Sequence, residues 1–313
     1  MTDYENFPDF EDFRAVGKRL SNWGRWGDDD QRGALNLITP ERLVEAAKLV
    51  KKGKVFDLAI PMDNTGPQLG EVRNNPLRIM SETGADQPYP EPFKYADDYI
   101  IMPLQGSSQW DALGHVFYDG QLYNGFPESD VSPHGLKHDS IDQISKDVIG
   151  RGVLLDIAAY RGVDWMQEGE VVTPEDLDGA AEKQGVEVKP GDILLFRTGW
   201  RRFYVEENDR EAFMAGEPGL GMAATRWASE KEVSVLASDN WAIEVLPGEY
   251  EDQVFNVHMV LLRDMGVTLG EILDFEELAA DCADDGVYEF LFCGPALPFT
   301  NGAGTPINPL AVK

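Results

Sequence analysis

The hydrophobic positions of this chain follow two patterns. Three short runs, residues 151–160, 191–200 and 233–243, are largely apolar, which is typical of buried strands. Between and after them lie segments whose apolar positions recur every three or four residues, and this spacing predicts amphipathic helices. The alternation of buried strands with amphipathic helices predicts a single α/β domain.

The strongest helix signal lies in the first fifth of the chain. Thr39 is a favourable N-cap residue, Pro40 suits the first helical position, and Glu41 suits the positive end of the helix dipole. Arg42 at the third helical position excludes a capping box, and Gly53 is expected to end the helix. We expect the inner face of this helix to carry four apolar residues: Leu43, Ala46, Ala47 and Val50.

Three more helices are expected further along the chain. The Thr-Pro-Glu sequence at 173–175 begins a second capped helix, and residues 218–232 predict a third with Trp227 on its inner face. The segment 256–282 predicts a helix that ends near Gly266, then a short strand and a last helix.

Residues 62–98 form a long segment rich in proline, glycine and asparagine between two expected strands, 55–61 and 98–104. A stretch of this length without regular structure is usually a lid, a binding loop or a disordered insert. We expect a lid, because the segment leads through the second strand directly into the most polar motif of the chain.

The composition narrows the classes of function. The chain has 313 residues and a net charge of -29, so it would repel phosphate backbones and anionic membrane surfaces. We therefore expect no nucleic-acid or membrane partner, and we interpret the acidic residues as a solvating surface.

Two further features indicate the compartment. Cys282 and Cys293 are too few for a disulfide framework and form no CxxC pair, which fits a reducing environment. Residues 1–20 are acidic where a signal peptide would be basic and then apolar, and no apolar run reaches the length of a membrane span. We expect a cytoplasmic protein with an acidic N-terminal arm over residues 1–20 and one domain over residues 21–313.

The motif that carries candidate chemistry is QGSSQWDALGH, residues 105–115. Its functional side chains are Gln105, Gln109, Asp111 and His115, spaced four, two and four residues apart. With histidines in place of both glutamines, the run would be a plausible row of ligands for a divalent cation. Taken on the residues alone, the motif fits an active site and a network of mutually satisfied polar groups equally well.

The remaining histidines have simpler interpretations. His134 and His138 are four residues apart, but Pro133 and Gly135 disfavour the helix that would bring them together, so we expect no metal site there. His258 lies in an apolar helix, where an isolated histidine is more often a hydrogen-bonded core residue than a ligand.

The motif resembles HxGTHxDxPxH, the opening motif of the cyclase family of metal-dependent hydrolases, which includes bacterial kynurenine formamidase, isatin hydrolase and trans-dienelactone hydrolase. Gln105 and Gln109 fall on the first two histidines of that motif, Asp111 on its aspartate and His115 on its last histidine, while Leu113 replaces its proline. The resemblance extends over about residues 20 to 300, through segments in the same order: GRGVLLDIAA, KPGDILLFRTGW and VHMVLLRDMGVTLGEILDFEEL.

The resemblance implies a swivelling β/β/α fold, a homo-oligomer (dimer or tetramer), and attack of activated water on an amide or ester carbonyl. It implies metal ligands at Gln105, Gln109 and Asp111. It implies catalytic roles for three further residues near the metal: His115, His258 and Glu271. Within this set Glu271 would add negative charge, His258 could also ligate through nitrogen, and His115 would act as general base.

The two glutamines change the expected metal chemistry. An amide oxygen is a harder and weaker ligand than imidazole, so the site should favour Mn²⁺, Mg²⁺ or Ca²⁺ over Zn²⁺, and we expect Mn²⁺. A second interpretation is a metal-free hydrolase in which His115, Asp111 and Glu271 act as acid–base groups and the Gln109 amide polarises the carbonyl. A third is a ligand-binding protein without turnover.

We expect hydrolysis of a small cyclic ester (lactone) or cyclic amide, with N-formylkynurenine as the alternative substrate of an arylformamidase. Trp23 and Trp26 lie in a segment short of apolar neighbours. We expect them to pack against the substrate pocket or a partner subunit; the alternative is packing under the N-terminal arm.

Overall fold

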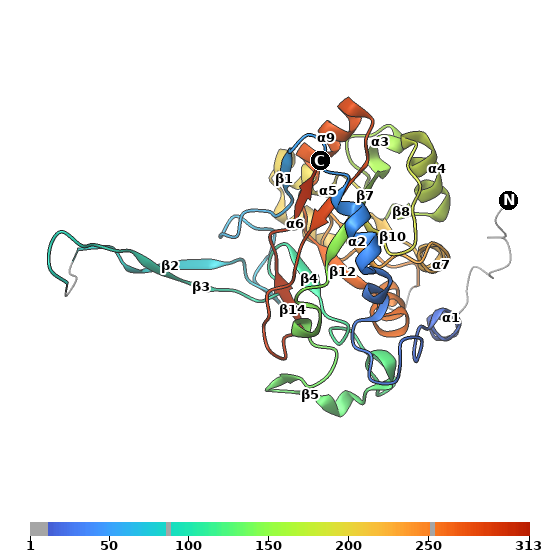
Figure 1. Ribbon diagram of the computed structural model, residues 1–313, viewed down its shortest axis with the longest axis horizontal. Coiled ribbons are helices and arrows are strands. Elements are labelled where there is room, and N and C mark those ends of the chain that lie inside the picture. Colours follow the sequence, from blue (N-terminus) through green and yellow to red (C-terminus); the bar gives the residue numbers. More distant parts are fainter. Residues whose placement is uncertain (1–11, 86–88, 251–253) are drawn as a thin grey trace.

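The computed structural model describes residues 12–85, 89–250 and 254–313, and these are built around a curled sheet of nine strands (Figure 1). The order of the strands across this sheet is β1 (Val55–Asp57), β15 (Leu310–Val312), β13 (Glu289–Cys293), β7 (Ile149–Asp156), β9 (Ile193–Arg197), β11 (Val235–Ser238), β12 (Thr268–Glu271), β4 (Gln109–Asp111) and β14 (Gly304–Pro306). The four strands β7, β9, β11 and β12 are parallel neighbours, and antiparallel strands extend the sheet on both sides.

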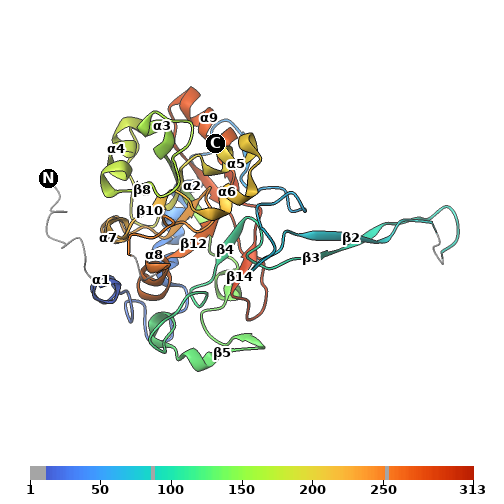
Figure 2. The ribbon, with the colours of Figure 1, turned by 180° about the vertical axis from the view of Figure 1, so that it is seen from behind.

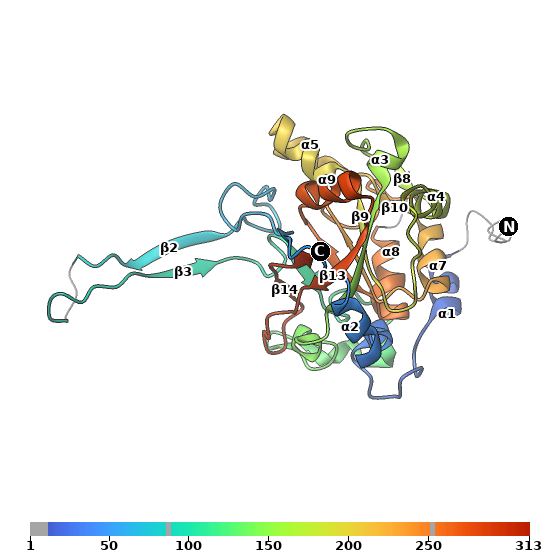
Figure 3. The same ribbon diagram turned by 45° about the horizontal axis from the view of Figure 1, so that its top comes forward.

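The central strands are apolar on both faces because both faces are covered. On one face, Val153, Phe196 and Leu236 pack against α4 (Pro174–Gln184), α7 (Met222–Glu230) and the helix that begins at α8 (Asn256–His258). On the other face, Leu154 and Leu195 pack with α9 (Glu276–Asp285). Figure 3 shows α4, α7 and α8 on one side of the sheet and α9 on the other. Near-continuous apolar runs are typical of such doubly covered parallel strands.

Most of the expected elements are confirmed. The three apolar runs form β7, β9 and β11, and Trp227 is fully buried on α7. Helix α4 is capped by Thr173, whose side chain completes a capping box with Asp176. Helix α8 continues as the π-helix η6 (Met259–Met265) and ends at Gly266 in the left-handed conformation, before β12 and α9. Four further helices are α1 (Phe13–Leu20), α3 (Ile157–Arg161), α5 (Trp200–Glu207) and α6 (Arg210–Ala215).

The capped helix after Thr39 differs from the expectation. Helix α2 (Pro40–Ala47) begins as predicted but ends at Ala47, well before Gly53. Of its expected inner face only Ala46 is buried, and Leu43 is exposed. The helix packs against β7 and β13, but its apolar residues do not form one buried stripe.

The expected lid contains regular structure that the sequence analysis missed. Residues 62–76 lie without strands against the body, but β2 (Leu77–Glu82) and β3 (Asp97–Ile101) pair as an antiparallel hairpin that extends away from it (Figure 1). Strand β3 corresponds to the expected 98–104 strand, but every residue of it is exposed. A strand therefore forms before the polar motif as expected, but it belongs to the exposed hairpin and not to the central sheet.

The N-terminal region packs on the helix η6. Residues 1–11 of the expected arm lie outside the described residues, while Phe13 of α1 is buried. The indole nitrogen of Trp23 donates a hydrogen bond to the carbonyl oxygen of Arg263 at 2.8 Å, and the Arg263 guanidinium lies over the Trp23 ring. Trp26 lies beneath Arg25. The oligomeric state stays a prediction. In the described part of the chain, no helix is long and apolar enough to cross a membrane.

Candidate functional site

The pairing of β4 with β12 brings the first site residues together. In this antiparallel pair Gln109 lies directly opposite Glu271 and Asp111 opposite Leu269. Residues two apart on a strand share one face, as do directly opposite residues, so Gln109, Asp111 and Glu271 project on the same side. The amide nitrogen of Gln109 lies 2.5 Å from Glu271 Oε2 and 3.4 Å from Asp111 Oδ1. Figure 2 shows β4 beside β12, with β14 next to it.

His258 completes the group from the first turn of α8. Its Nε2 lies 3.0 Å from Glu271 Oε1, and its Nδ1 lies 2.6 Å from Glu244 Oε1. The Glu244 carboxylate also accepts hydrogen bonds from the backbone nitrogens of Val257 and His258, at 3.2 and 2.9 Å. Glu244 thus holds both the start of the helix and the imidazole ring. The sequence analysis missed it, because only the fold brings residue 244 to residue 258.

Three of these residues have the geometry of a metal centre. Ligand atoms of Asp111, His258 and Glu271 all lie within 4.8 Å of one another, and all three side chains are buried. Two further oxygens in the site, Asp111 Oδ2 and Gln109 Oε1, are buried without a hydrogen-bond partner. A carboxylate oxygen buried without a partner is costly, and a cation would satisfy it. The donor set of carboxylates, one imidazole and an amide therefore fits a divalent cation.

The arrangement around His258 has the form of a supported metal ligand. Histidines that bind metals usually donate their second ring nitrogen to a carboxylate, which fixes the orientation of the ring. Glu244 is placed for that hydrogen bond at Nδ1, which leaves Nε2 to face Asp111 and Glu271. Burial alone would lower the pKa of His258, but the hydrogen bonds to Glu244 and Glu271 outweigh it and raise this pKa to about 10.

His115 lies at the open edge of the group. Its Nε2 is 3.8 Å from Asp111 Oδ1, and its side chain is 22% exposed against 1% for Asp111. Burial lowers the pKa of His115, with Asp111 acting in the opposite direction and Arg73 in the same direction. Burial raises the pKa of Asp111 to about 6, against the attraction of His115 and other nearby positive groups. His115 is therefore a neutral imidazole with access to solvent, next to a buried carboxyl.

The two glutamines are placed differently. The side chain of Gln109 lies among the carboxylates, and rotation of its amide by half a turn would direct Oε1 instead of Nε2 toward them. The side chain of Gln105 lies beside β14, with its Nε2 2.5 Å from the position that a Cβ on Gly304 would occupy. Among the described residues, no hydrogen bond joins the Gln105 side chain to Asp111, His258 or Glu271.

A second acidic residue that the sequence analysis missed lies behind the site. Glu217 is 1% exposed, and its two carboxylate oxygens accept hydrogen bonds from the backbone nitrogens of Trp241 and Ala242 at 2.6 and 2.7 Å. Burial raises the pKa of Glu217 well above its usual value, and Glu271 contributes in the same direction. This coupling places Glu217 in the electrostatic environment of the candidate centre.

Backbone strain adjoins the same group. Ile243 and Ile272, which flank Glu244 and Glu271 in the chain, adopt φ values of 60° and 57°. β-branched residues rarely occupy this region, and such strain is found at functional sites. The fully buried Asn240 holds both: its side-chain oxygen accepts from the backbone nitrogen of Ile243 and its carbonyl oxygen accepts from that of Ile272.

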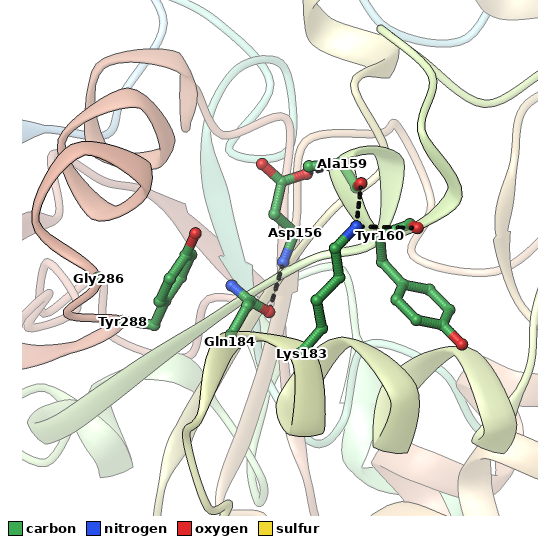
Figure 4. A pocket seen from close by; sticks show the side chains of 7 residues that line it. All are labelled: Asp156, Ala159, Tyr160, Lys183, Gln184, Gly286 and Tyr288. Atoms are coloured by element: carbon green, nitrogen blue, oxygen red, sulfur yellow. Dashed lines mark hydrogen bonds between the residues drawn. The ribbon is translucent and has the colours of Figure 1, made fainter.

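Other candidates are structural. His138 pairs with Asp130 at 2.6 Å and stacks on Phe126, and His134 belongs to no metal-binding group within the described ranges. A surface hollow of about 260 Å³ lies at the junction of α3 and α4 (Figure 4). Its lysine, Lys183, donates hydrogen bonds to the carbonyl oxygens of Ala159 and Tyr160 at the end of α3. These groups hold two helices together.

Comparisons with known proteins agree with this geometry. A family model described as "Putative cyclase" matches residues 56–245, more than half of the chain. A solved structure described as a novel cyclase is 43% identical with a TM-score of 0.89, and the match covers 95% of this chain and 99% of that chain. No curated protein matches the chain.

More distant solved structures share the fold. Isatin hydrolase A from Ralstonia solanacearum is 17% identical with a TM-score of 0.61, over 82% of this chain and 91% of that chain. A protein described as a "predicted metal-dependent hydrolase" from Bacillus stearothermophilus is 17% identical with a TM-score of 0.53, over 82% of this chain and 97% of that chain. The match of the family model, together with 43% identity to a novel cyclase over nearly the whole length, shows that this protein belongs to the cyclase family.

Proposed function

We propose that this protein is a metal-dependent hydrolase that opens a small cyclic ester (lactone) or cyclic amide. The observation that carries the proposal is the buried group of Asp111, His258 and Glu271, with an unpartnered oxygen on Asp111 and a solvent-accessible imidazole next to it. A buried site for a cation next to a base suits hydrolysis of a carbonyl compound by activated water.

Asp111, His258 and Glu271 would hold the cation, with the amide oxygen of Gln109 as a fourth ligand after rotation of its side chain. Glu244 would keep the proton on His258 Nδ1 and leave Nε2 free as a ligand. When bound, a divalent cation would supply Lewis acidity and lower the pKa of a water molecule. Because most of these ligand atoms are oxygens, we propose that Mn²⁺ is preferred over Zn²⁺.

His115 would act as the general base. It is the imidazole of the site with exposure to solvent, and the Asp111 carboxylate beside it orients the ring and stabilises the imidazolium. His115 would take a proton from the attacking water and return it to the leaving oxygen or nitrogen. The ring of the substrate opens at its C–O or C–N bond, and the product is a carboxylate with a free hydroxyl or amino group.

The test is hydrolysis of a panel of lactones, cyclic imides and N-formylkynurenine after removal of metal and addition of Mn²⁺ or Zn²⁺. We expect turnover of a cyclic substrate to be lost on metal removal and restored best by Mn²⁺. Asp111→Asn should lose activity with either metal. A double Gln105→His, Gln109→His variant should shift the preference toward Zn²⁺.

Three results would contradict the proposal in different ways. Full activity of the metal-stripped protein, unchanged by added metal, would leave a metal-free hydrolase with His115 as its base. Turnover of N-formylkynurenine alone would identify an arylformamidase. No turnover of any substrate with any metal would indicate a binding protein.

A further inference from the structure

A cationic side chain next to the candidate centre has no role in the proposed chemistry. Arg73 belongs to the segment 62–76, and its Nη1 donates one hydrogen bond, to the carbonyl oxygen of Gln105 at 3.2 Å. No carboxylate of the described residues lies within ion-pair distance of its guanidinium. A protein with 56 acidic and 27 basic residues has many carboxylates to pair with, so this partly buried arginine is unusual in facing none of them.

Arg73 lies at the end of an aromatic surface that leads to the metal-binding group. Its guanidinium lies 5.3 Å from the centroid of the Trp241 ring. The ring centroids of Trp241 and Phe255 are 6.4 Å apart. The Phe255 ring meets the His258 ring edge-on, with 5.5 Å between their centroids. The charge of Arg73 also acts on Asp111. A flat molecule on this surface could therefore reach Arg73 with one end and the candidate centre with the other.

A second hydrogen-bond donor lies at the same place. Gln68 is 3% exposed, its side-chain oxygen accepts from the Trp241 indole nitrogen at 3.4 Å, and its Nε2 is buried without a partner. The backbone of Gln68 is held by the Asn75 side chain through hydrogen bonds of 2.9 and 3.0 Å. These bonds close the turn that carries Arg73. A buried amide donor without a partner, held rigidly, indicates a missing acceptor.

We propose that Arg73 and Gln68 form a subsite for a carboxylate, so that the substrate is a flat, apolar carbonyl compound that carries a negative charge. The inference deepens the proposed function, on which it rests for the identity of the reacting centre. A protein with a net charge of -29 repels anions, so a fixed positive charge at Arg73 would favour the binding of one. A guanidinium with unused donors on an aromatic face suits a carboxylate, which it can bind through two parallel hydrogen bonds.

Binding of benzoate and of its neutral analogue benzamide tests the subsite without any turnover. The full-length protein is stripped of metal and dialysed free of chelator, and both affinities are measured by titration calorimetry. We expect benzoate to bind at least about tenfold more tightly than benzamide. Arg73→Gln should lower the affinity for benzoate by about ten- to hundredfold and leave the affinity for benzamide unchanged. Arg73→Lys keeps the charge but loses the planar guanidinium, so its affinity for benzoate should lie between those of the parent and Arg73→Gln.

The chain offers a matched control at Arg78, which lies on the exposed hairpin and contacts Asp98. Arg78→Gln removes the same charge and should bind benzoate like the parent. An equal loss of affinity for benzoate and benzamide in Arg73→Gln would overturn the proposal, because the role of Arg73 would then be to shape the loop. Unchanged benzoate binding in Arg73→Gln would also overturn it.

Hydrolysis of phthalide and of phthalide bearing a ring carboxylate separates this inference from the proposed function. We expect Arg73→Gln to raise KM for the charged lactone with little change in kcat, and to leave the neutral lactone unaffected. If neither lactone is hydrolysed with any metal while benzoate binding depends on Arg73, the proposed function fails and the subsite stands. Turnover with equal effects of Arg73→Gln on both lactones would sink the subsite and support the function.

Discussion

The carboxyl group of Asp139 offers a quantitative test of the electrostatics of this fold. Asp139 is 1% exposed, and neither of its carboxyl oxygens has a hydrogen-bond partner. Its backbone is held in place: the nitrogen donates to the side-chain oxygen of Gln31 at 2.9 Å and the carbonyl oxygen accepts from Gly114 at 3.0 Å. Burial, and then the nearby charge of Asp30, raise the pKa of Asp139 to about 8.

The size of the effect follows from proton linkage. An aspartate in the unfolded chain has a pKa of about 3.9, so between about pH 4 and pH 8 the unfolded state has released a proton that the folded state retains. The contribution of Asp139 to stability is therefore fully present below about pH 4 and is lost as the pH rises through 8. The expected loss is up to about 1.4 kcal/mol for each pH unit, or up to about 4 kcal/mol by pH 7.

Asp139→Asn removes this titration. Asparagine cannot ionise, so we expect the unfolding free energy of the variant minus that of the parent to increase with pH and to level off above pH 8. The other groups near Asp139 are Asp30 and the Tyr123 hydroxyl, which donates to Asp30 at 3.0 Å, and both remain in the variant. The comparison therefore isolates one carboxyl group.

The measurement is guanidinium-induced unfolding of metal-free protein at a series of pH values from 4.5 to 9. Asp98→Asn, at an exposed position on the hairpin, controls for the loss of one negative charge from a highly acidic protein. A constant difference between Asp139→Asn and the parent at every pH would refute the reasoning, because it would mean that the Asp139 carboxyl titrates alike in the folded and unfolded states. A slope of equal size in Asp98→Asn would have the same consequence.

Two further predictions concern the candidate centre and its support. Glu244→Gln keeps the size of the side chain but weakens its hold on His258 Nδ1, so we expect Mn²⁺ affinity, measured by calorimetry, to fall about 10- to 100-fold. Glu249→Gln alters the hydrogen bond that the carboxylate accepts from the backbone nitrogen of Met222 at the start of α7, and it should leave that affinity unchanged. Gly270→Ala on β12 should destabilise the fold by about 1–3 kcal/mol in a denaturant titration, because its Cβ would overlap the Trp110 ring; unaltered stability would mean that the β4–β12 packing is looser than described.

The sequence by itself determined the local elements whose signals are complete within a few residues. Thr173 and the residues after it contain a whole capping box, and helix α4 forms there. The apolar runs of β7, β9 and β11 indicate strands covered on both faces, because such runs are typical of parallel strands between two layers. The motif from Gln105 to His115 identified Gln109 and Asp111 as candidate site residues, but the expected strand was 98–104 and not β4, which carries them.

Tertiary structure decided which of these residues meet. Glu271 lies opposite Gln109 only because β4 and β12 pair in one particular register, and a shift of one residue would turn the side chains to the other face. Glu244 reaches His258 because the chain folds back from β11 to α8, and no spacing in the sequence encodes that return. Arg73 could not be identified from the sequence either, because its segment has no periodic pattern of hydrophobic positions.

The same reason accounts for the errors. The exposed hairpin of β2 and β3 has apolar residues such as Ile79 and Ile100 on its surface, so its sequence could not be distinguished from that of a buried strand. Leu43 on α2 has the spacing of a core residue but is 37% exposed. A hydrophobic pattern reports what a side chain would gain by burial, whereas only the arrangement of the whole chain determines whether another surface is there to bury it.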